Sequence, residues 1–442
     1  MKNNVLVTKK VFGTARLNVR LPNANVLQLV TLKNEIPVDK LEEAIIKVSK
    51  KHCLINSRLR VDSDNSIWYE IIDFMKPLIY RADGNETLEE IMIKEFQKAF
   101  DLDNGPLIRF IIINQKSQTY LLICCHHVIC DGLALVYLTN DIFKAIAYPE
   151  YKIKQINKPI LQDENTVPEK LKKSFLTKLV INSINKKWQK KDLIFDASKY
   201  SEIQNEFWNN HKPGILIWDL SKEQTKRLVK RSKENGVTIN TTITTAFLRA
   251  EKDVLNKKEY SEEVIISVSL RDYLRDNPED TMGFFASAIR PKLRYEADKG
   301  FWDNAKDFHK KIKRLITETN VFKSQVIGLF NPNFIDALAL GKFNKCEDKT
   351  VKKMIQKKKM NVINTTFTLT NLGRISIDEE VRQHMITSIL GPTVYGDTMD
   401  KYIGVITINN QIFFSISFNQ NIISKDDIKK IKNKIIEYVE EM

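Results

Sequence analysis

The residues best suited to chemistry are two adjacent histidines, His126 and His127, in a chain of 442 residues with only six histidines. An apolar run precedes them, and Asp131-Gly132 follows after three further residues. A helical apolar pattern comes next, so the order predicts a buried strand, a polar turn and a helix. A neutral imidazole at the mouth of such a strand, with an ordinary pKa of about 6.5, is suited to act as a general base. The alternative is an ordinary turn in which both histidines bind backbone carbonyls.

The spacing His126-His127-x-x-x-Asp131-Gly132 resembles the active-site motif of the chloramphenicol acetyltransferase-like superfamily. This superfamily includes peptide-synthetase condensation domains, plant-type alcohol acyltransferases and mycobacterial polyketide-associated acyltransferases. The resemblance implies an α/β fold (α+β, two-layer) of two lobes that form a V-shaped cleft. It also implies transfer of an acyl group from a thioester to a hydroxyl or amine. The donor would be acyl-CoA or a carrier-protein phosphopantetheine thioester, with no bound cofactor and no metal.

The resemblance assigns a separate role to each residue of the motif. His127 is expected to be the general base and His126 to brace the turn, while Asp131 and Gly132 shape it. Val268-Ser269-Leu270-Arg271 ends a predicted strand and resembles the family position where an arginine from the second lobe meets the motif aspartate. Because a buried carboxylate needs a partner, we predict an Asp131–Arg271 pair. A surface position for Arg271 is the alternative.

Two later segments resemble parts of the family's acyl site. Thr370-Asn371-Leu372-Gly373-Arg374 resembles a stretch on the segment that crosses between the lobes. The Asn371 side chain fits two roles equally well. One is to donate a hydrogen bond to a developing oxyanion, typically worth a few kcal/mol, and the other is to cap the crossover turn. Gly283-Phe284-Phe285 resembles a segment that lines the channel, and it also fits a buried aromatic pair.

Three further segments resemble the superfamily in structure rather than in chemistry. They are residues 52–58 (His-Cys-Leu-Ile-Asn-Ser-Arg), residues 100–109 (Phe-Asp-Leu through Pro-Leu-Ile-Arg) and residues 236–248, which open a helix of the second lobe. Together they spread the resemblance over most of the chain.

The length predicts two lobes, because a single core rarely grows beyond about 250–300 residues. We expect an N-terminal lobe, 1–195, that carries the motif, and a C-terminal lobe, 196–442, with a crossover segment near 364–400. Helices are predicted at Val38–Lys50, Thr87–Ala99, Pro168–Lys191, Ser221–Asn235, Thr238–Leu255, 299–319 and Lys425–Glu440, and part of 341–360 is polar and partly helical. Strands are predicted at Leu27–Leu32, Trp68–Ile72, Ile108–Ile113, Tyr120–Cys125, Gly214–Trp218, Val264–Leu270, Asn364–Leu369, Ile403–Ile408 and Ile412–Phe418. Alternating strands and helices in both halves favour layered α/β lobes.

The composition indicates a reducing cytoplasmic setting. No apolar stretch approaches the ~18–20 residues of a membrane span, and the N-terminus lacks the apolar core of a secretory signal. The five cysteines have no metal-type spacing, and three of them, Cys124, Cys125 and Cys130, surround the histidine motif. Buried thiols explain them, and Cys130 as a nucleophile paired with His127 is the alternative.

The net charge of +15 favours anionic partners without identifying one. The phosphates of coenzyme A, an acidic acyl carrier protein and an anionic membrane all qualify, as does a generic solvated surface. No nucleic-acid motif is present, and we expect a monomer. Residues 168–191 form a basic amphipathic pattern with Phe175, Leu176, Leu179, Val180, Ile184 and Trp188 on one side. This helix is expected to pack on the protein's own core, with peripheral membrane contact or an acidic partner as the alternatives.

Two other functions compete with a soluble acyltransferase. A non-catalytic condensation-like scaffold would keep the fold but lose His127 or Asp131, and both are present. A membrane-surface lipid O-acyltransferase would use the 168–191 helix as its anchor. No "DFGWG" stretch lies near the C-terminus, so the plant-type branch is disfavoured, and no carrier domain flanks the motif in this sequence. The motif's place in the first third of the chain also disfavours the dihydrolipoyl acyltransferases.

Overall fold

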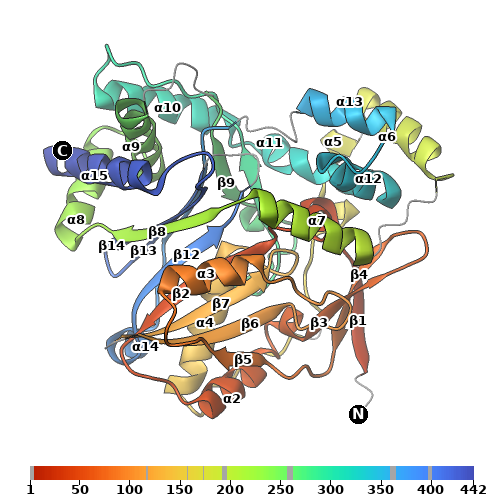
Figure 1. The fold of residues 1–442 in the computed structure, drawn as a ribbon, viewed down its shortest axis with the longest axis horizontal. Coiled ribbons are helices and arrows are strands. Elements are labelled where there is room, and N and C mark those ends of the chain that lie inside the picture. Colours follow the sequence, from red (N-terminus) through yellow and green to blue (C-terminus); the bar gives the residue numbers. More distant parts are fainter. Residues whose placement is uncertain are drawn as a thin grey trace.

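The computed structural model describes residues 4–115, 118–156, 158–172, 174–191, 197–255, 262–358, 365–396 and 401–442. Its strands form three sheets, and helices pack against the two larger ones (Figure 1). The predicted α/β class with layered helices and sheets is confirmed. Within these ranges no helix combines the length and the apolar character needed to cross a bilayer.

The first large sheet carries the histidine motif. Its strand order is β12 (Ile386–Val394), β2 (Asn25–Leu32), β7 (Gln118–His126), β6 (Ile108–Gln115) and β5 (Leu78–Arg81). All residues of β2 are buried, because helices cover both faces of this sheet. β6 and β7 form the predicted antiparallel hairpin, in which Ile108 lies opposite Cys125.

Three helices cover this sheet. They are α2 (Val38–Val48), α3 (Leu88–Gln97) and α4 (Gly132–Ala147). The Asn25 side chain binds carbonyls at the end of α3, and the Gln28 side chain binds Thr139 of α4. Because side chains alternate along a strand, these contacts place α3 and α4 on opposite faces. The short α14 (Glu379–His384) packs against α4 and leads into β12.

A small sheet and a short helix join the N-terminal segment to both halves of the chain. The small sheet has the order β1 (Val5–Lys10), β4 (Ile67–Ile72) and β3 (Ser57–Val61), and a 3-10 turn, Cys53–Asn56, enters β3. Helix α1 (Gly13–Asn18) follows β1. The Arg16 guanidinium of α1 contacts the buried Asp336 carboxylate at 3.0 Å.

The second large sheet occupies the C-terminal half. Its order is β10 (Ala286–Ile289), β9 (Ile265–Ser269), β11 (Thr368–Arg374), β13 (Lys401–Ile408), β14 (Gln411–Asn419) and β8 (Pro213–Asp219). Helices α8 (Lys222–Glu234), α9 (Ile239–Val254), α10 (Phe301–Leu315) and α15 (Lys425–Glu441) pack over it or on one another. Ser424 caps α15 as predicted, because its side chain accepts from the Asp427 N–H. The predicted helix 299–319 ends early, since Thr317 leaves it and caps the next helix.

A helical corner completes the molecule (Figure 1). It contains α5 (Glu169–Lys172), α6 (Phe175–Trp188), α7 (Ala197–Asn210), α11 (Glu318–Phe322), α12 (Pro332–Lys342) and α13 (Lys349–Lys358). The prediction of one helix over Pro168–Lys191 is wrong, because α5 ends at Lys172 and Ser174, before α6, has a non-helical ψ of 119°. The prediction that all the apolar residues of this segment lie on one side of the helix is also wrong. Ile184 and Trp188 are buried, whereas Phe175, Leu179 and Val180 are exposed.

One strand from the second half of the sequence lies in the first sheet. Within the expected crossover near 364–400, β12 pairs with β2 and also packs on β13 and β14, whereas β11 stays between β9 and β13. The expected boundary at residues 195 and 196 and the predicted strand start at Asn364 lie outside the described residues. Three further 3-10 turns are at Glu164–Thr166, Arg271–Tyr273 and Lys323–Leu329.

Candidate active site

The turn between β7 and α4 is fixed by hydrogen bonds from distant parts of the first half. β7 ends at His126, and the next backbone N–H, that of His127, donates to the Ala24 carbonyl at 2.7 Å. The Tyr69 hydroxyl, on β4, donates to the Val128 carbonyl at 2.7 Å. These partners hold the turn in one shape, so the side chain of His127 has a defined starting point.

His127 is the histidine whose ring remains available for chemistry. It is half-buried, and its Nδ1 lies 2.8 Å from the Cys130 carbonyl oxygen, a group that only accepts hydrogen bonds. Nδ1 therefore carries the proton and Nε2 holds a lone pair. Burial disfavours the charged ring, but hydrogen bonds at Cys130 and the charge of Asp131 outweigh burial and raise the pKa of His127 above its ordinary value. The ring also meets Phe284 edge to face, with centroids 4.9 Å apart.

His126 has the opposite character. It is 1% exposed, and its Nδ1 accepts a hydrogen bond from the Val128 N–H at 3.2 Å. The proton of the neutral ring therefore lies on Nε2. Burial, together with the nearby His127 and Arg109, lowers the pKa of His126 to about 3. His126 is neutral at pH 7, and its Nδ1 is engaged within the turn, which is the geometry expected of a brace. Its buried Nε2 has no hydrogen-bond partner among the described residues.

Asp131 lies at the first turn of α4 and binds two backbone N–H groups. Its Oδ1 accepts from Ala134 at 2.8 Å, which caps the helix. Its Oδ2 accepts from Phe285 at 2.9 Å. Phe285 is adjacent to Phe284, whose ring contacts His127. Asp131 therefore connects the histidine turn to the segment of the second half that packs against it.

The predicted contact between Asp131 and Arg271 is present. The Arg271 Nη2 atom lies 3.6 Å from the Asp131 Oδ1 atom, and both side chains are almost fully buried. The closer partners of the guanidinium are backbone carbonyls, those of Glu279 at 2.8 Å and Thr281 at 3.0 Å. Its plane also lies over the Phe285 ring, 4.5 Å from the centroid. Arg271 thus shapes the loop before β10 and supplies positive charge to Asp131 at slightly longer range.

Gly132 is required by close approach of other strands. A Cβ atom at this position would lie 2.6 Å from Pro392 Cγ of β12 and 3.0 Å from Leu372 Cδ2 of β11. Its backbone angles are ordinary, so the constraint is space and not conformation. The start of α4 is therefore in contact with both large sheets.

Asn371 is close in sequence to that contact but its side chain is already engaged. Its Oδ1 accepts from the Gly373 N–H at 2.8 Å, which forms a local turn where β11 loses register with β13. Gly373 has a φ of +73°, a conformation that favours glycine. Asn371 is half-buried. This contact matches the turn-capping alternative for Asn371, and the crossing itself is made by β12.

Comparison with known proteins gives the same fold. Residues 22–163 match the sequence model of the condensation domain family. Bacitracin synthase 3 from Bacillus licheniformis is 25% identical over 284 residues, which is 62% of this chain but 4% of that protein. The chain thus spans only a small part of such curated relatives.

Solved structures match over nearly the whole chain. The first condensation domain of the CDA synthetase has a TM-score of 0.66 at 10% identity, covering 99% of this chain and 96% of that one. The trichothecene 15-O-acetyltransferase of Fusarium sporotrichioides has a TM-score of 0.66 at 14% identity, covering 98% and 95%. The chain has the condensation-domain fold. The fold that the resemblance implies is therefore confirmed.

Within this condensation-domain fold, the cysteines near the motif are poor nucleophiles. Cys124, Cys125 and Cys130 are fully buried, and burial raises the pKa of each thiol. The Cys130 sulfur lies 3.6 Å from the His126 carbonyl oxygen. The backbone carbonyl of Cys130 is the group that binds His127 Nδ1. These contacts favour the interpretation of the cysteines as buried packing residues.

A buried charge cluster links the early family-like segment to the loop that Arg271 shapes. The fully buried His52 lies 2.9 Å from the Asp141 carboxylate of α4, and Lys51 lies 2.7 Å from the same carboxylate. Lys51 also contacts Asp280 at 2.7 Å. Burial opposes ionisation of Asp141, but hydrogen bonds from His52 and Lys51 outweigh burial and lower its pKa. The 279–285 loop is therefore held at Asp131 and, through Lys51, at Asp141.

Several supporting residues carry no recognisable signal in the sequence. Tyr69 lies on a strand whose pattern indicates only core packing, yet its hydroxyl holds the histidine turn. Gln162, 5% exposed in a loop, donates to the Phe284 carbonyl at 2.6 Å. Asn25 pairs with His126 across the sheet and binds the carbonyls that end α3. None has a spacing relation to the motif, so single-sequence reasoning does not find them.

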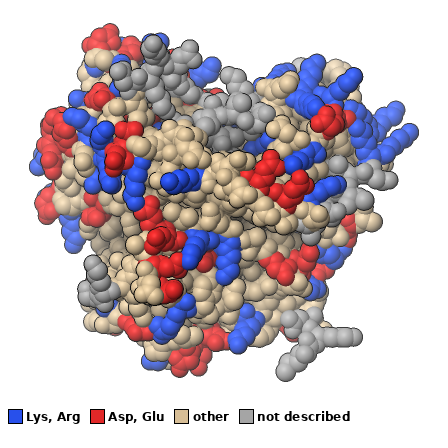
Figure 2. All heavy atoms as spheres, in the orientation of Figure 1, with Lys and Arg blue, Asp and Glu red and all other residues tan. Residues whose placement is uncertain are grey.

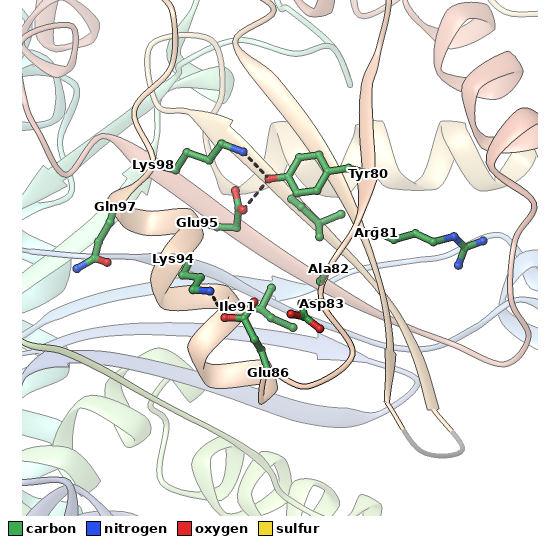
Figure 3. Close-up of a pocket in the computed structure, with 11 residues that line it drawn as sticks. Tyr80, Arg81, Ala82, Asp83, Glu86, Ile91, Lys94, Glu95, Gln97 and Lys98 are labelled. Atoms are coloured by element: carbon green, nitrogen blue, oxygen red, sulfur yellow. Dashed lines mark hydrogen bonds and ion pairs between the residues drawn. The ribbon is translucent and has the colours of Figure 1, made fainter.

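A hollow of about 430 Å³ lies between α3 and β5, on the side of α3 away from the histidine motif (Figure 3). There the Tyr80 hydroxyl donates to the Glu95 carboxylate at 2.6 Å, and Lys98 points to the same hydroxyl. Glu95 also binds Arg109, whose guanidinium lies over the Phe100 ring, 4.2 Å from its centroid. That ring meets His126 edge to face at 6.0 Å. The hollow is thus separated from the motif by a continuous series of buried side chains.

Two other hollows, of about 700 and 540 Å³, adjoin Phe100 and Tyr200. The larger is lined on one side by β3, including Arg58 and Arg60, and the smaller by α7 and the residues after α3. Glu70 neutralises the two arginines at 3.0 and 2.8 Å. Phe100 forms part of both hollows, and its ring contacts His126. These hollows therefore lie on the His126 side of the turn and not over His127.

Proposed function

We propose that this protein is an acyltransferase that moves an acyl group from a thioester to a hydroxyl or amine, with His127 as the general base. The observation that carries the proposal is the hydrogen bond from His127 Nδ1 to the Cys130 carbonyl. It leaves Nε2 unprotonated on a half-buried ring. The condensation-domain match and the fold shared with an O-acetyltransferase support the same reaction class.

The proposed step needs one proton acceptor and no covalent intermediate. His127 Nε2 removes the proton from the acceptor hydroxyl or amine as its oxygen or nitrogen attacks the thioester carbonyl. The new C–O or C–N bond forms, the C–S bond breaks, and the imidazolium returns the proton to the departing thiolate. The raised pKa of His127 suits this exchange, because the ring must both accept and release a proton near neutral pH.

The other motif residues have supporting roles in this proposal. His126 stays neutral and braces the turn. Asp131, Gly132 and Arg271 fix the position of the turn against the second half and do not touch substrate. Asn371 pins its own turn through Oδ1.

The donor is proposed to be acyl-CoA or a phosphopantetheine thioester on an acyl carrier protein. The basic surface supports either, since coenzyme A carries phosphates and carrier proteins are acidic. The condensation-domain match supports the carrier-bound form, and the fold shared with an acetyltransferase is compatible with the free form. The acceptor is a small alcohol or amine.

A thiol-release assay tests this function. The wild-type protein is given a panel of acyl-CoA thioesters and acyl carrier proteins with pooled alcohols and amines, beside His127→Ala. The matched control is His384→Ala, because His384 is an exposed histidine at the end of α14 whose side chain contacts Glu380. We expect acceptor-dependent thiol release in the wild type and in the control and none above background in His127→Ala. Equal rates in wild type and His127→Ala would contradict the role of His127, and no release from any donor would favour a non-catalytic scaffold.

A further inference from the structure

Helix α6 presents an apolar surface to solvent at its start. Phe175 is 73% exposed, and Leu179 and Val180 are each 50% exposed. Large apolar side chains at these exposures are uncommon in groups on monomeric surfaces, and grouped ones mark an interaction site. At about 100° per residue, Phe175 lies opposite the buried Ile184 and Leu179 lies opposite the buried Trp188. Val180 lies at the edge of the outward face, about 40° from Ile184.

The same outward face becomes cationic towards the end of the helix. Lys186 and Lys187 are exposed on it, and Lys190 is exposed in the turn just after the last helical residue, Trp188. The sequence of α6 contains no acidic residue, and neither does that of the neighbouring α13, which exposes Lys352, Lys353 and Lys357. Figure 2 shows lysine and arginine side chains gathered over this corner of the molecule.

Only part of this charge is neutralised within the protein. Asp348 binds Lys187 at 3.2 Å and Lys191 at 2.5 Å, and Glu347 binds Lys352. Within the described ranges, Lys186 and Lys190 form no ion pair. Their charges are therefore available to an anionic partner.

The helix cannot turn its apolar group inward. The Asn185 side chain donates to the Leu329 carbonyl at 3.0 Å and accepts from the Asn331 N–H at 2.7 Å. The Trp188 ring packs on Phe334 with centroids 5.5 Å apart. These contacts fix the rotation of α6, so Phe175 and its neighbours stay exposed unless something outside the molecule covers them.

We propose that the outward face of α6, with the exposed lysines of α13 beside it, binds the surface of an anionic lipid bilayer. Phe175, Leu179 and Val180 enter the boundary between headgroups and acyl chains, and the lysines contact anionic headgroups. Long lysine stems can extend from an inserted helix to the headgroup level. This surface goes beyond the acyl transfer proposed above and does not depend on it.

Two features favour a bilayer over an acidic protein. The basic residues of α6 and α13 are all lysines, whereas protein interfaces are enriched in arginine and depleted in lysine. The apolar side chains are exposed on α6, which lies at an outer corner of the molecule (Figure 1), and the hollows described above are lined by other elements. In protein interfaces the binding energy concentrates where anchoring side chains enter pockets, whereas insertion into a bilayer requires no pocket.

Vesicle co-sedimentation of the full chain tests this proposal. The probes are phosphatidylcholine vesicles with and without about one-third phosphatidylglycerol, at low and at physiological salt. We expect binding to the anionic vesicles that weakens as salt rises, and little binding to the neutral ones. The triple variant F175S/L179S/V180S is expected to bind the anionic vesicles at least tenfold more weakly, as is K186E/K187E/K190E.

The matched control is L6S/F74S/I422S, which removes three exposed apolar side chains elsewhere (63, 45 and 40% exposed). It should bind as the wild type does, and thermal unfolding should confirm that all variants are folded. Absence of binding to anionic vesicles at low salt would overturn the proposal, as would an equal loss in the control. Binding of an acidic acyl carrier protein that F175S/L179S/V180S abolishes, with no vesicle binding, would assign the surface to a protein partner instead. Vesicle binding is read without substrate, so its failure leaves the proposed acyl transfer untouched.

Discussion

The histidine turn and the outer corner of α6 differ in how fully their polar and charged groups are engaged. In the turn, Tyr69 binds Val128, Cys130 binds His127, and Asp131 binds two N–H groups. His127 Nε2 is the atom this arrangement leaves for chemistry. At the corner, by contrast, several lysines and three apolar side chains face solvent together. The turn is built to place one nitrogen accurately, whereas the corner offers a broad surface that tolerates imprecise contact.

The largest effect that separates the two regions is expected from His127→Gln. Loss of a general base typically reduces the rate about 10²–10⁴-fold. Since His127 is half-buried and its neighbours hold the turn without its ring, stability should change by less than about 1 kcal/mol. Acyl-transfer rates and urea unfolding measured on the same sample check both parts. A large fall in stability with the loss of rate would mean that His127 is structural.

Arg271→Ala should have the next largest effect, and it should act on stability. The change removes two hydrogen bonds to carbonyls and leaves the buried Asp131 charge without its cation, so we expect a loss of about 3 kcal/mol. Urea denaturation measures it. The control is Arg290→Ala, which breaks an exposed pair with Glu263 and should change stability by about 0–1 kcal/mol. Equal losses in the two variants would show that Arg271 does not hold the turn.

The pH dependence of stability should reveal the buried state of His126. Its pKa is about 3 in the folded protein and about 6.5 when unfolded, so below pH 6.5 the unfolded chain binds a proton that the folded chain refuses. The stability from this residue is complete above pH 6.5 and is lost as pH falls towards 3, by about 2 kcal/mol between pH 7 and pH 5. The free energies of unfolding of the wild type and of His126→Gln, measured at pH 7 and pH 5, isolate the contribution of His126. The buried His52 contributes equally to both proteins. An identical pH dependence in the two proteins would contradict the assignment.

The smallest effect is expected at the corner. Phe175→Ser removes an apolar side chain that is 73% exposed, so the free energy of unfolding should change by less than about 0.5 kcal/mol. On the same helix, Trp188→Ala should cost about 3–5 kcal/mol, because Trp188 is 1% exposed. Denaturant titrations of both variants make the comparison. A destabilisation by Phe175→Ser close to that by Trp188→Ala would mean that the outer face is packed.

The sequence predicted what is local. The hairpin of β6 and β7, the strand-turn-helix order and the aspartate at the start of α4 all follow from neighbouring residues. The Asp131–Arg271 contact spans 140 positions and came from family resemblance, since no local pattern links the two residues. β12 was missed, because its Gly391-Pro392 pair interrupts the apolar pattern and its partner β2 lies far away in the sequence.

The corner shows a different limit of sequence reasoning. The apolar residues of α6 spread over more than half of the helix circumference at about 100° per residue, so one packed face cannot bury them all. Which part is buried depends on Asn185 and on α12, more than a hundred residues later in the chain. The sequence therefore identified a basic amphipathic segment but assigned Phe175 and Trp188 to the same side.

The most direct test of the central claim is to measure the protonation of the two adjacent histidines by NMR of isotope-labelled protein. His126→Gln and His127→Gln assign the signals. We expect neutral His127 to carry its proton on Nδ1 and to titrate above pH 6.5, and His126 to carry its proton on Nε2 and not to titrate down to pH 5. A neutral His127 ring that carries its proton on Nε2 instead of Nδ1, or titration of both rings together, would contradict the assignment of His127 as the base.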